Sequence, residues 1–310
     1  MTAAASPKNG GGIPPAPVFG TAGRRRRWPP GRRGARDLVF WGLCSVALLC
    51  ILGPALSILV SVFHKAWPFL SPSLLTHTTA NNAGLKNAIV GTLMLLLGVL
   101  IVDGIIGVGA GIWLAEFAPR RLGGPLRFFS EVLSGMPSIV IGYVGYVALV
   151  VGFHWGYSLL AAILALSVLV LPYVVKNTEL ALRGVPSALR EGGTALGLHR
   201  AHVVARILLP PAIPGIVSGL IVALAISTGE TAPLLFTANF TDAMPSLHLL
   251  HHSVPYLTYV TFSNTSQPSA RAQGLGAAAG AVTLIMLLLL IIAGRLVGRR
   301  ARRATERMSL

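Results

Sequence analysis

Few side chains in this sequence can do chemistry, and the most informative is a carboxylate beside a long apolar stretch. Glu230 follows Gly229 and is followed by Thr231 and Pro233. A carboxylate at membrane depth is costly in lipid and usually faces a bundle interior or a water-filled path. Glycine and proline break or end a helix, and a broken helix end exposes backbone N–H groups that suit an anion. We expect these residues to border a path for a polar substrate; the alternative is a carboxylate hydrated at the outer surface.

Two further polar positions interrupt apolar stretches. Asp103 lies among glycines, and a lone intramembrane carboxylate is a functional candidate by default, although a structural ion pair is the interpretation we favour. Pro137, between Gly135 and Ser138, removes a backbone hydrogen bond and predicts a kink. Ser138 would satisfy the freed carbonyl or line the path; the alternative is a kink that serves only helix packing.

The sequence does not assemble a catalytic set at membrane depth, so we expect no enzyme. An intramembrane enzyme would need paired aspartates or a histidine cluster with zinc, and the carboxylates of the apolar stretches are scattered: Asp103, Glu116, Glu131 and Glu230. Three outer-loop histidines have the i, i+3, i+4 spacing of one helix face, but only Asp242 is near to support a metal: His248, His251 and His252. We expect a surface helix there and no metal site.

Composition indicates a membrane protein. Of the 310 residues, 54% are hydrophobic and 11% are charged, and the mean hydropathy is +0.72. A soluble domain carries about 25% charged residues, so a soluble enzyme and a disordered chain are both disfavoured. Cys44 and Cys50 share one apolar run, which argues against a disulfide or a metal ligand. A bilayer core needs about 20 apolar residues in a helix. Six stretches qualify: Leu38–Phe63, Ala88–Phe117, Phe128–Val151, Trp155–Val175, Ala212–Phe236 and Leu275–Val297.

The positive charges predict the orientation. With the N-terminus inside, the cytoplasmic segments hold 22 of the 25 Lys and Arg residues, and the outer segments hold only Lys65, Lys86 and Arg271. Flanking Lys and Arg stay inside during insertion, so both termini are predicted to be cytoplasmic in a plasma-membrane protein. Topology therefore explains the net charge of +16, and no nucleic-acid function is needed.

The first 37 residues are rich in Gly, Pro, Ala and Arg, and we interpret residues 1–37 as a disordered basic cytoplasmic tail. The run Arg24–Arg27 beside Trp28 would meet anionic headgroups. Arg32 and Arg33 resemble a twin-arginine signal, but the following stretch is too long for a signal sequence. We therefore expect a retained first helix and a membrane domain over residues 38–310.

One inner loop, residues 176–210, is long and unusual. Glu179 and Arg183 stand at i, i+4, which is a helical pair. Pro186 suits the first turn of a short helix over residues 187–191. Three glycines follow it: Gly192, Gly193 and Gly197. Glycines at this density suit a place where another surface approaches the backbone closely; the alternative is a flexible connector.

This loop resembles the signature of ABC importer permeases, which is E-A-A, three residues, G, nine residues, I-x-L-P. Glu191 matches the first position and Gly197 the glycine, and small glycines replace the two alanines. The pattern closes on three residues: Ile207, Leu209 and Pro210.

The resemblance implies an all-α, polytopic protein with six transmembrane helices and the type I (MetI-like) ABC importer permease fold. It covers about residues 85–298, with the coupling loop at residues 186–200. In that family the loop forms a short helix that docks on a cytoplasmic ATPase present in two copies. The sequence has no G-x-x-x-x-G-K-[ST] phosphate loop. ATP and Mg²⁺ would therefore bind to the separate ATPase, and no cofactor is expected on this chain.

Two segments narrow the resemblance to phosphate-specific importers. Residues 229–237, GETAPLLFT, and residues 135–142, GMPSIVIG, are similar to the phosphate permeases, the first most of all to the A-type (PstA) subunit. A second, PstC-type permease and an extracytoplasmic phosphate-binding protein are then the implied partners. A lone carboxylate repels phosphate, so Glu230 would pair with a cation or act as a gate. The family commonly has Arg at the position of Ile226, so the cation would come from the partner permease.

Two alternatives remain open at this point. One is a permease for another oxyanion, sulfate or molybdate. The other, from a different class, is a secondary transporter or channel that works without an ATPase, against which the coupling-loop signature argues.

Overall fold

The computed structural model describes residues 30–80 and 84–308, and the regular elements within these ranges are all helices, as predicted. Most of the predicted tail, residues 1–29, lies outside the described residues. The chain divides into two compact units, Met1–Leu56 and Ser57–Leu310.

The described part of the first unit belongs to one helix, α1 (Pro30–Ala66). Its apolar side chains are exposed from Leu38 to Val60; Leu38 is 75% and Trp41 is 68% accessible. A helix that is apolar all round is stable only in lipid or against another protein. Residues 30–37 are helical rather than part of the tail, because proline suits the first helical position and Arg and Ala are good helix formers.

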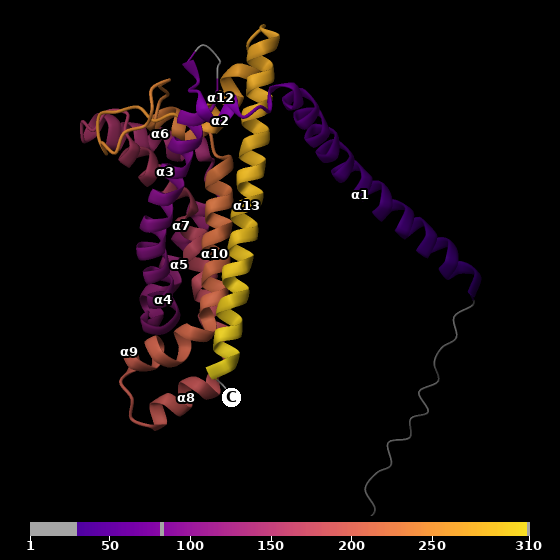
Figure 1. Cartoon of the computed structure of the whole chain (residues 1–310). Coiled ribbons are helices and arrows are strands. Elements are labelled where there is room, and N and C mark those ends of the chain that lie inside the picture. The colour runs from indigo at the N-terminus through magenta and orange to yellow at the C-terminus, as the bar shows by residue number, and fades with distance from the viewer. Residues whose placement is uncertain (1–29, 81–83, 309–310) are drawn as a thin grey trace, which may run out of the picture. The chain divides into compact units, whose positions relative to one another are not determined.

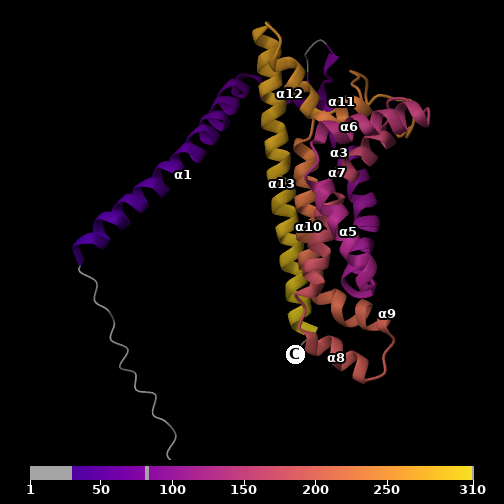
Figure 2. The same cartoon turned by 180° about the vertical axis from the view of Figure 1, so that it is seen from behind.

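The second unit is a helical bundle, shown from opposite sides in Figures 1 and 2. Its longer helices run side by side: α3 (Lys86–Val102), α5 (Arg120–Ser134), α7 (Leu159–Arg183), α10 (Leu209–Gly229) and α13 (Ala270–Met308). One end carries α8 (Ser187–Ala195) and α9 (Arg200–Val203), and the other carries α6 (Ser138–Gly145), α11 (Ala232–Thr237) and α12 (Leu257–Thr265). Short elements complete the chain: η1 (Trp67–Phe69), α2 (Ser73–Thr76), η3 (Asp103–Gly107), α4 (Val108–Ile112), η4 (Trp113–Phe117), η5 (Tyr146–Gly152) and η6 (Val204–Leu208).

Five described helices are long and apolar enough to cross a membrane, and a bent pair makes a sixth. The predicted third stretch, Phe128–Val151, is that pair: Arg121–Ser134 and Ser138–Gly152 meet at 101°. The prediction of a kink at Pro137 was too mild, because one helix ends and another begins. The carbonyl freed by Pro137 is that of Leu133, and it accepts from the Met136 amide at 3.2 Å, so the Ser138 hydroxyl is not needed to satisfy it.

The predicted inner loop, residues 176–210, is largely helical. The α7 helix continues to Arg183, and the next helical run begins at Arg200, so the connection that carries α8 spans residues 184–199. The extension is stable because Thr178, Glu179 and Leu182 are buried in the bundle. Pro186 is the N-cap residue of α8 and not in its first turn as predicted.

The core positions the two ends of the bundle. One apolar cluster surrounds Leu166 and Val170 of α7 between α3, α10 and α11, and another gathers residues of α7, η6 and α10 near the α8 end. Glycine allows close contact between two of the spans: a Cβ on Gly111 would lie 2.5 Å from the Cβ of Thr178. The second and fourth spans are therefore locked together at backbone distance.

Candidate functional site

The helix break at Glu230 forms as the sequence predicted. The α10 helix ends at Gly229, α11 begins at Ala232, and Glu230 between them is extended, with φ −73° and ψ 134°. Thr258 of α12 donates a hydrogen bond to the Glu230 carbonyl oxygen at 2.9 Å. A side chain from another helix thus satisfies the backbone freed by the break, which allows irregular backbone at this depth.

A cavity of about 420 Å³ opens beside the break, between α10, α12 and α13. Gly229 lies on its wall together with four threonines: Thr231, Thr258, Thr261 and Thr283. Three of the hydroxyls donate hydrogen bonds to backbone carbonyls. They therefore present lone pairs and no protons to the cavity, and an anion bound here would need donors from elsewhere.

Two buried hydroxyls lie close to the break. Ser227 and Tyr256, 3% and 1% exposed, line a cavity of about 10 Å³ together with Glu230, and neither hydroxyl oxygen has a hydrogen-bond partner in the described part of the chain. That volume is near the minimum for one water molecule. The sequence analysis did not single out either residue; Ser227 lies one turn before Glu230, the only signal that pointed to it.

The segments GETAPLLFT and GMPSIVIG pack against each other. A Cβ on Gly142 would lie 2.6 Å from the Cα of Pro233, and the rings of Tyr143 and Phe236 meet edge to face at 6.1 Å. The bend before α6 brings about this contact. Pro137 is exposed and Ser138 is half-buried at the start of α6.

Asp103 is 1% exposed in η3, and both carboxylate oxygens lack a hydrogen-bond partner among the described residues. The expected structural ion pair does not form within the described part of the chain. No Lys or Arg occurs between Lys86 and Arg120, so the second span offers no cation near Asp103.

The outer-loop histidines do not form the predicted helix. Residues 238–256 are irregular, and His251 has a positive φ of 62°. The rings of His248 and His252 lie 4.9 Å apart, but no group of three ligands that could hold a metal occurs among the described residues. Pro245 and Pro255 favour extended backbone before them and oppose a helix.

The signature residues of the inner loop divide into two sets. Glu191, Gly192 and Gly197 are exposed, and nothing lies within 4 Å of a Cβ built on either glycine. Gly197 has φ +72°, a left-handed conformation that glycine adopts freely after a helix. Leu196 beside it is 79% exposed. These residues present an open surface at the end of the bundle.

The other set packs inside the chain. A Cβ on Gly193 would lie 3.0 Å from side-chain atoms of Val203 and Ile207, and Leu209 packs on the same apolar cluster. Pro210 is half-buried in the first turn of α10. The small residue at position 193 therefore serves contact within this chain, whereas the sequence suggested approach by another surface.

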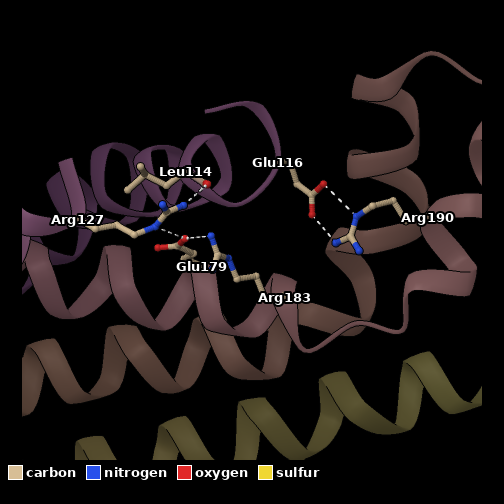
Figure 3. A network of polar contacts seen from close by, with 6 residues as sticks. All are labelled: Leu114, Glu116, Arg127, Glu179, Arg183 and Arg190. Atoms are coloured by element: carbon tan, nitrogen blue, oxygen red, sulfur yellow. Dashed lines mark hydrogen bonds and ion pairs between the residues drawn. The ribbon is translucent and has the colours of Figure 1, made fainter. Parts of the chain in front are cut away.

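Two buried carboxylates form ion pairs with arginines near the α8 end of the bundle (Figure 3). Glu116, whose side chain is 4% exposed, accepts from Arg190 Nε at 3.2 Å and from Nη2 at 2.5 Å. The Glu116 carboxylate raises the pKa of the Arg190 guanidinium above its usual value by hydrogen bonding. This two-point contact joins the end of the second span to α8.

Glu179 is the second buried carboxylate, with its side chain 9% exposed. Arg127 Nε and Arg183 Nη2 both lie 2.7 Å from Glu179 Oε1, and Arg127 Nη2 donates to the Leu114 carbonyl at 3.1 Å. The predicted Glu179–Arg183 pair is confirmed. The contacts of Arg127 and Arg190 were missed, because they join residues 52 and 74 positions apart.

Residues 107–303 match the family model described as the binding-protein-dependent transport system inner membrane component. This chain belongs to that family. The matched range includes α8, the ion pairs and the helix break, so the features described above lie within the family's own region, apart from Asp103 at its edge.

Relatives of this permease carry consistent names. It is 45% identical over 273 residues, 88% of this chain and 91% of the relative, to phosphate transport system permease protein PstA 2 of Mycobacterium bovis. It is 36% identical over 242 residues, 76% of this chain and 81% of the relative, to phosphate transport system permease protein PstA of Yersinia pestis.

Solved structures share the permease fold. The bacterial alginate ABC transporter in complex with its pentasaccharide-bound periplasmic protein aligns with TM-score 0.66 at 14% identity, over 87% of this chain and 97% of that chain. The inward-facing MetNI methionine ABC transporter aligns with TM-score 0.58 at 19% identity, over 70% and 95%. The fold is therefore that of the MetI-like type I ABC importer permeases, as the loop signature predicted.

Proposed function

We propose that this chain is the A-type permease subunit of an ATP-driven importer of inorganic phosphate. The observation that carries the proposal is the 45% identity, over 88% of this chain, with a relative named as a phosphate transport permease. The packing of GMPSIVIG on GETAPLLFT supports it, because both segments that resemble phosphate permeases meet at the helix break. An importer of sulfate or molybdate is disfavoured by the same names.

The path would run past the helix break. A multiply charged anion cannot cross lipid unaided, since its desolvation is prohibitive. Glu230, Gly229 and Thr231 lie at the break, but the fifth span and the outer loop after it contain no Lys or Arg between Arg206 and Arg271. Half-buried Ile226 stands where the family commonly has arginine. We therefore assign the cation that meets phosphate to a second, PstC-type permease, with which Glu230 would pair or gate the path.

Energy would enter at α8. Glu191, Gly192 and Gly197 form an exposed surface that suits docking on a cytoplasmic ATPase, of which an importer carries two copies. ATP and Mg²⁺ would bind there and not on this chain. An extracytoplasmic phosphate-binding protein would deliver substrate at the opposite end of the bundle, which carries α6, α11 and α12.

The orientation follows from the charges. The C-terminal end of α13 lies at the same end of the bundle as α8 (Figures 1 and 2). The sequence is rich in Arg in the last part of α13 and in the segment around α8, which supports a cytoplasmic location for this end. After replacement of Cys44 and Cys50 by alanine, cysteines introduced at Ala5 and Thr305 should resist an impermeant thiol reagent in intact cells and react after lysis. Labelling of either cysteine in intact cells would contradict cytoplasmic termini.

Uptake tests the substrate. Deletion of the gene should remove high-affinity uptake of radioactive phosphate at micromolar concentration, and the wild-type chain should restore it. Sulfate and molybdate uptake, measured in the same cells, should not change. Normal phosphate uptake with lost sulfate or molybdate uptake would replace phosphate by that oxyanion. Uptake that continues in vesicles without ATP would favour a secondary transporter.

A further inference from the structure

The Glu116–Arg190 pair is the only ion pair among the described residues that joins α8 to a span. Glu116 lies in η4, at the end of the continuous 32-residue helical run Lys86–Phe117. Arg190 binds it through two nitrogens, at 3.2 and 2.5 Å, with the carboxylate side chain 4% and the arginine side chain 33% exposed. A two-point contact fixes direction as well as distance, since the planar guanidinium cannot turn without losing one bond.

A second contact reaches the same point. The Arg200 guanidinium of α9 lies 5.4 Å from the centre of the Phe117 ring. Consecutive residues at the end of the second span are thus held by arginines on both short helices that follow α7. A cation over an aromatic face is a weaker contact than a buried ion pair.

The α8 helix also contacts the start of the fifth span. Gly193 packs on Val203 and Ile207, so this contact is apolar and close. The opposite side of α8 is exposed: Glu191 and Ala195, which lie about opposite to Gly193 around the helix, are both exposed. The helix therefore bridges the second and fifth spans by an ionic contact and an apolar contact, and it leaves one face free.

The Glu179 cluster contrasts with this arrangement. Arg127 belongs to α5, and both Glu179 and Arg183 belong to α7. With the Arg127 bond to Leu114, this cluster joins the second, third and fourth spans and includes no residue of α8. This cluster holds the spans to one another, and it has no direct contact through which movement of α8 could act on it.

We propose that Glu116 and Arg190 are the positioning pair through which movement of α8 pulls on the second span. The proposal rests on the proposed function, because it takes α8 to be moved by an ATPase. Glu191 and Arg190 are neighbours with opposite tasks: Glu191 faces the solvent-exposed side, and Arg190 faces the permease. Loss of the pair should leave the ATPase bound but disconnect its cycle from the second span.

The test uses the complete importer, purified and reconstituted with Glu116→Gln or Arg190→Gln. Glutamine keeps the size of the glutamate side chain and removes its charge. We expect normal membrane abundance, normal co-purification of the ATPase, and about tenfold more ATP hydrolysed per phosphate transported, the size of coupling between contacting charged residues. The exchange variant with Glu116→Arg and Arg190→Glu should recover part of the coupling. Arg190→Lys, which keeps the charge but not the two-point geometry, should be intermediate.

The matched control is the Lys176–Glu131 pair. Its atoms lie 3.7 Å apart and its side chains are 64% and 67% exposed, so Glu131→Gln should leave the ratio of ATP to phosphate unchanged. An unchanged ratio in Glu116→Gln and Arg190→Gln would overturn the proposal. Loss of the ATPase from the Arg190→Gln complex would also overturn it, because Arg190 would then face the ATPase. Loss of membrane abundance in all three Arg190 and Glu116 single variants would assign the pair to folding only.

Failure of the proposed function has a different outcome. If the wild-type chain co-purifies with no ATPase, or the wild-type importer does not transport phosphate, the function assigned above is wrong. If the wild type behaves as proposed and only the effect of the variants is missing, the positioning role alone is wrong.

Discussion

Buried polar groups differ between the helix break at Glu230 and the α8 end of the bundle, where the two buried carboxylates form ion pairs. At the break, the buried hydroxyls of Ser227 and Tyr256 have no partner among the described residues, and three of the four threonine hydroxyls on the cavity wall already donate to backbone carbonyls. At the α8 end, the buried carboxylates Glu116 and Glu179 each meet two nitrogen donors. Satisfied charges hold helices in one geometry, whereas unsatisfied groups remain available to water, a substrate or another subunit. This difference suits the proposed function, in which the helix break borders a path that changes shape during transport and the α8 end transmits movement without changing shape.

The largest effect is expected from Glu179→Gln, which removes the carboxylate that Arg127 and Arg183 both contact. Removal of one partner from a buried ion pair leaves the other charge uncompensated. Arg127 and Arg183 are 37% and 52% exposed, so solvent screens part of that cost, and we expect a loss of about 2–3 kcal/mol of stability. The thermal midpoint of the purified permease in detergent measures it. Glu131→Gln is the control, and an equal shift in both variants would contradict the distinction between buried and exposed pairs.

A smaller effect is expected from Gly197→Leu, which tests whether the open face of α8 docks on a partner. Overpacking of a fitted contact costs about 1–3 kcal/mol, so the ATPase should bind about 5- to 150-fold more weakly. Transport should be lost while membrane abundance stays near wild type. Co-purification of the ATPase is the measurement.

The control for Gly197→Leu is Gly197→Ala. Both carry the cost of a left-handed backbone, about 1–2 kcal/mol, since φ is +72°. Only leucine adds bulk to the exposed face. Full uptake and undiminished co-purification with Gly197→Leu would mean that the loop is only a connector. Glu191→Ala should act in the same direction more mildly, because an exposed ion pair contributes about 0–1 kcal/mol.

The smallest effect is expected from Asp103→Asn, which belongs to the unpaired part of the molecule. Since the buried carboxylate has no partner among the described residues, replacing it by an amide should raise stability slightly, by about 1 kcal/mol or less. The thermal midpoint in detergent measures the change in stability, and phosphate uptake measures the change in transport. A drop in stability would reveal a partner for Asp103 in the assembled importer, and lost uptake at unchanged stability would place Asp103 on the path.

Much of the candidate site was predictable because it depends on local sequence. Gly229 and Pro233 together favour the end of one helix and the start of the next, and the fixed spacing from Glu191 to Pro210 located α8 and the span that follows it. Glu179 and Arg183 pair through one helical turn. The hydropathy of the apolar stretches predicted six spans, and their charged flanks predicted which ends share a side.

Other features were not predictable, because they depend on contacts between distant segments. Nothing near Glu116 indicates that it meets Arg190, and the ion pair expected at Asp103 does not form among the described residues, since the second span carries no Lys or Arg between Lys86 and Arg120. The sequence predicted one third span with a kink at Pro137, but the chain turns by 101° there and α6 packs on α11. Histidines with helical spacing lie in an irregular segment, since spacing alone cannot overcome flanking prolines.

The sequence by itself determined the class of protein, the number of spans, the helix break and the loop signature, because each follows from the local properties of consecutive residues. Only the tertiary structure decided which signature residues face outward and which pack within, as Gly192 and Gly193 show. It also decided that the buried carboxylates near α8 are paired and that Asp103 is not. The physical reason is that pairing and burial depend on which helices touch, and the helices that touch here come from segments many tens of residues apart.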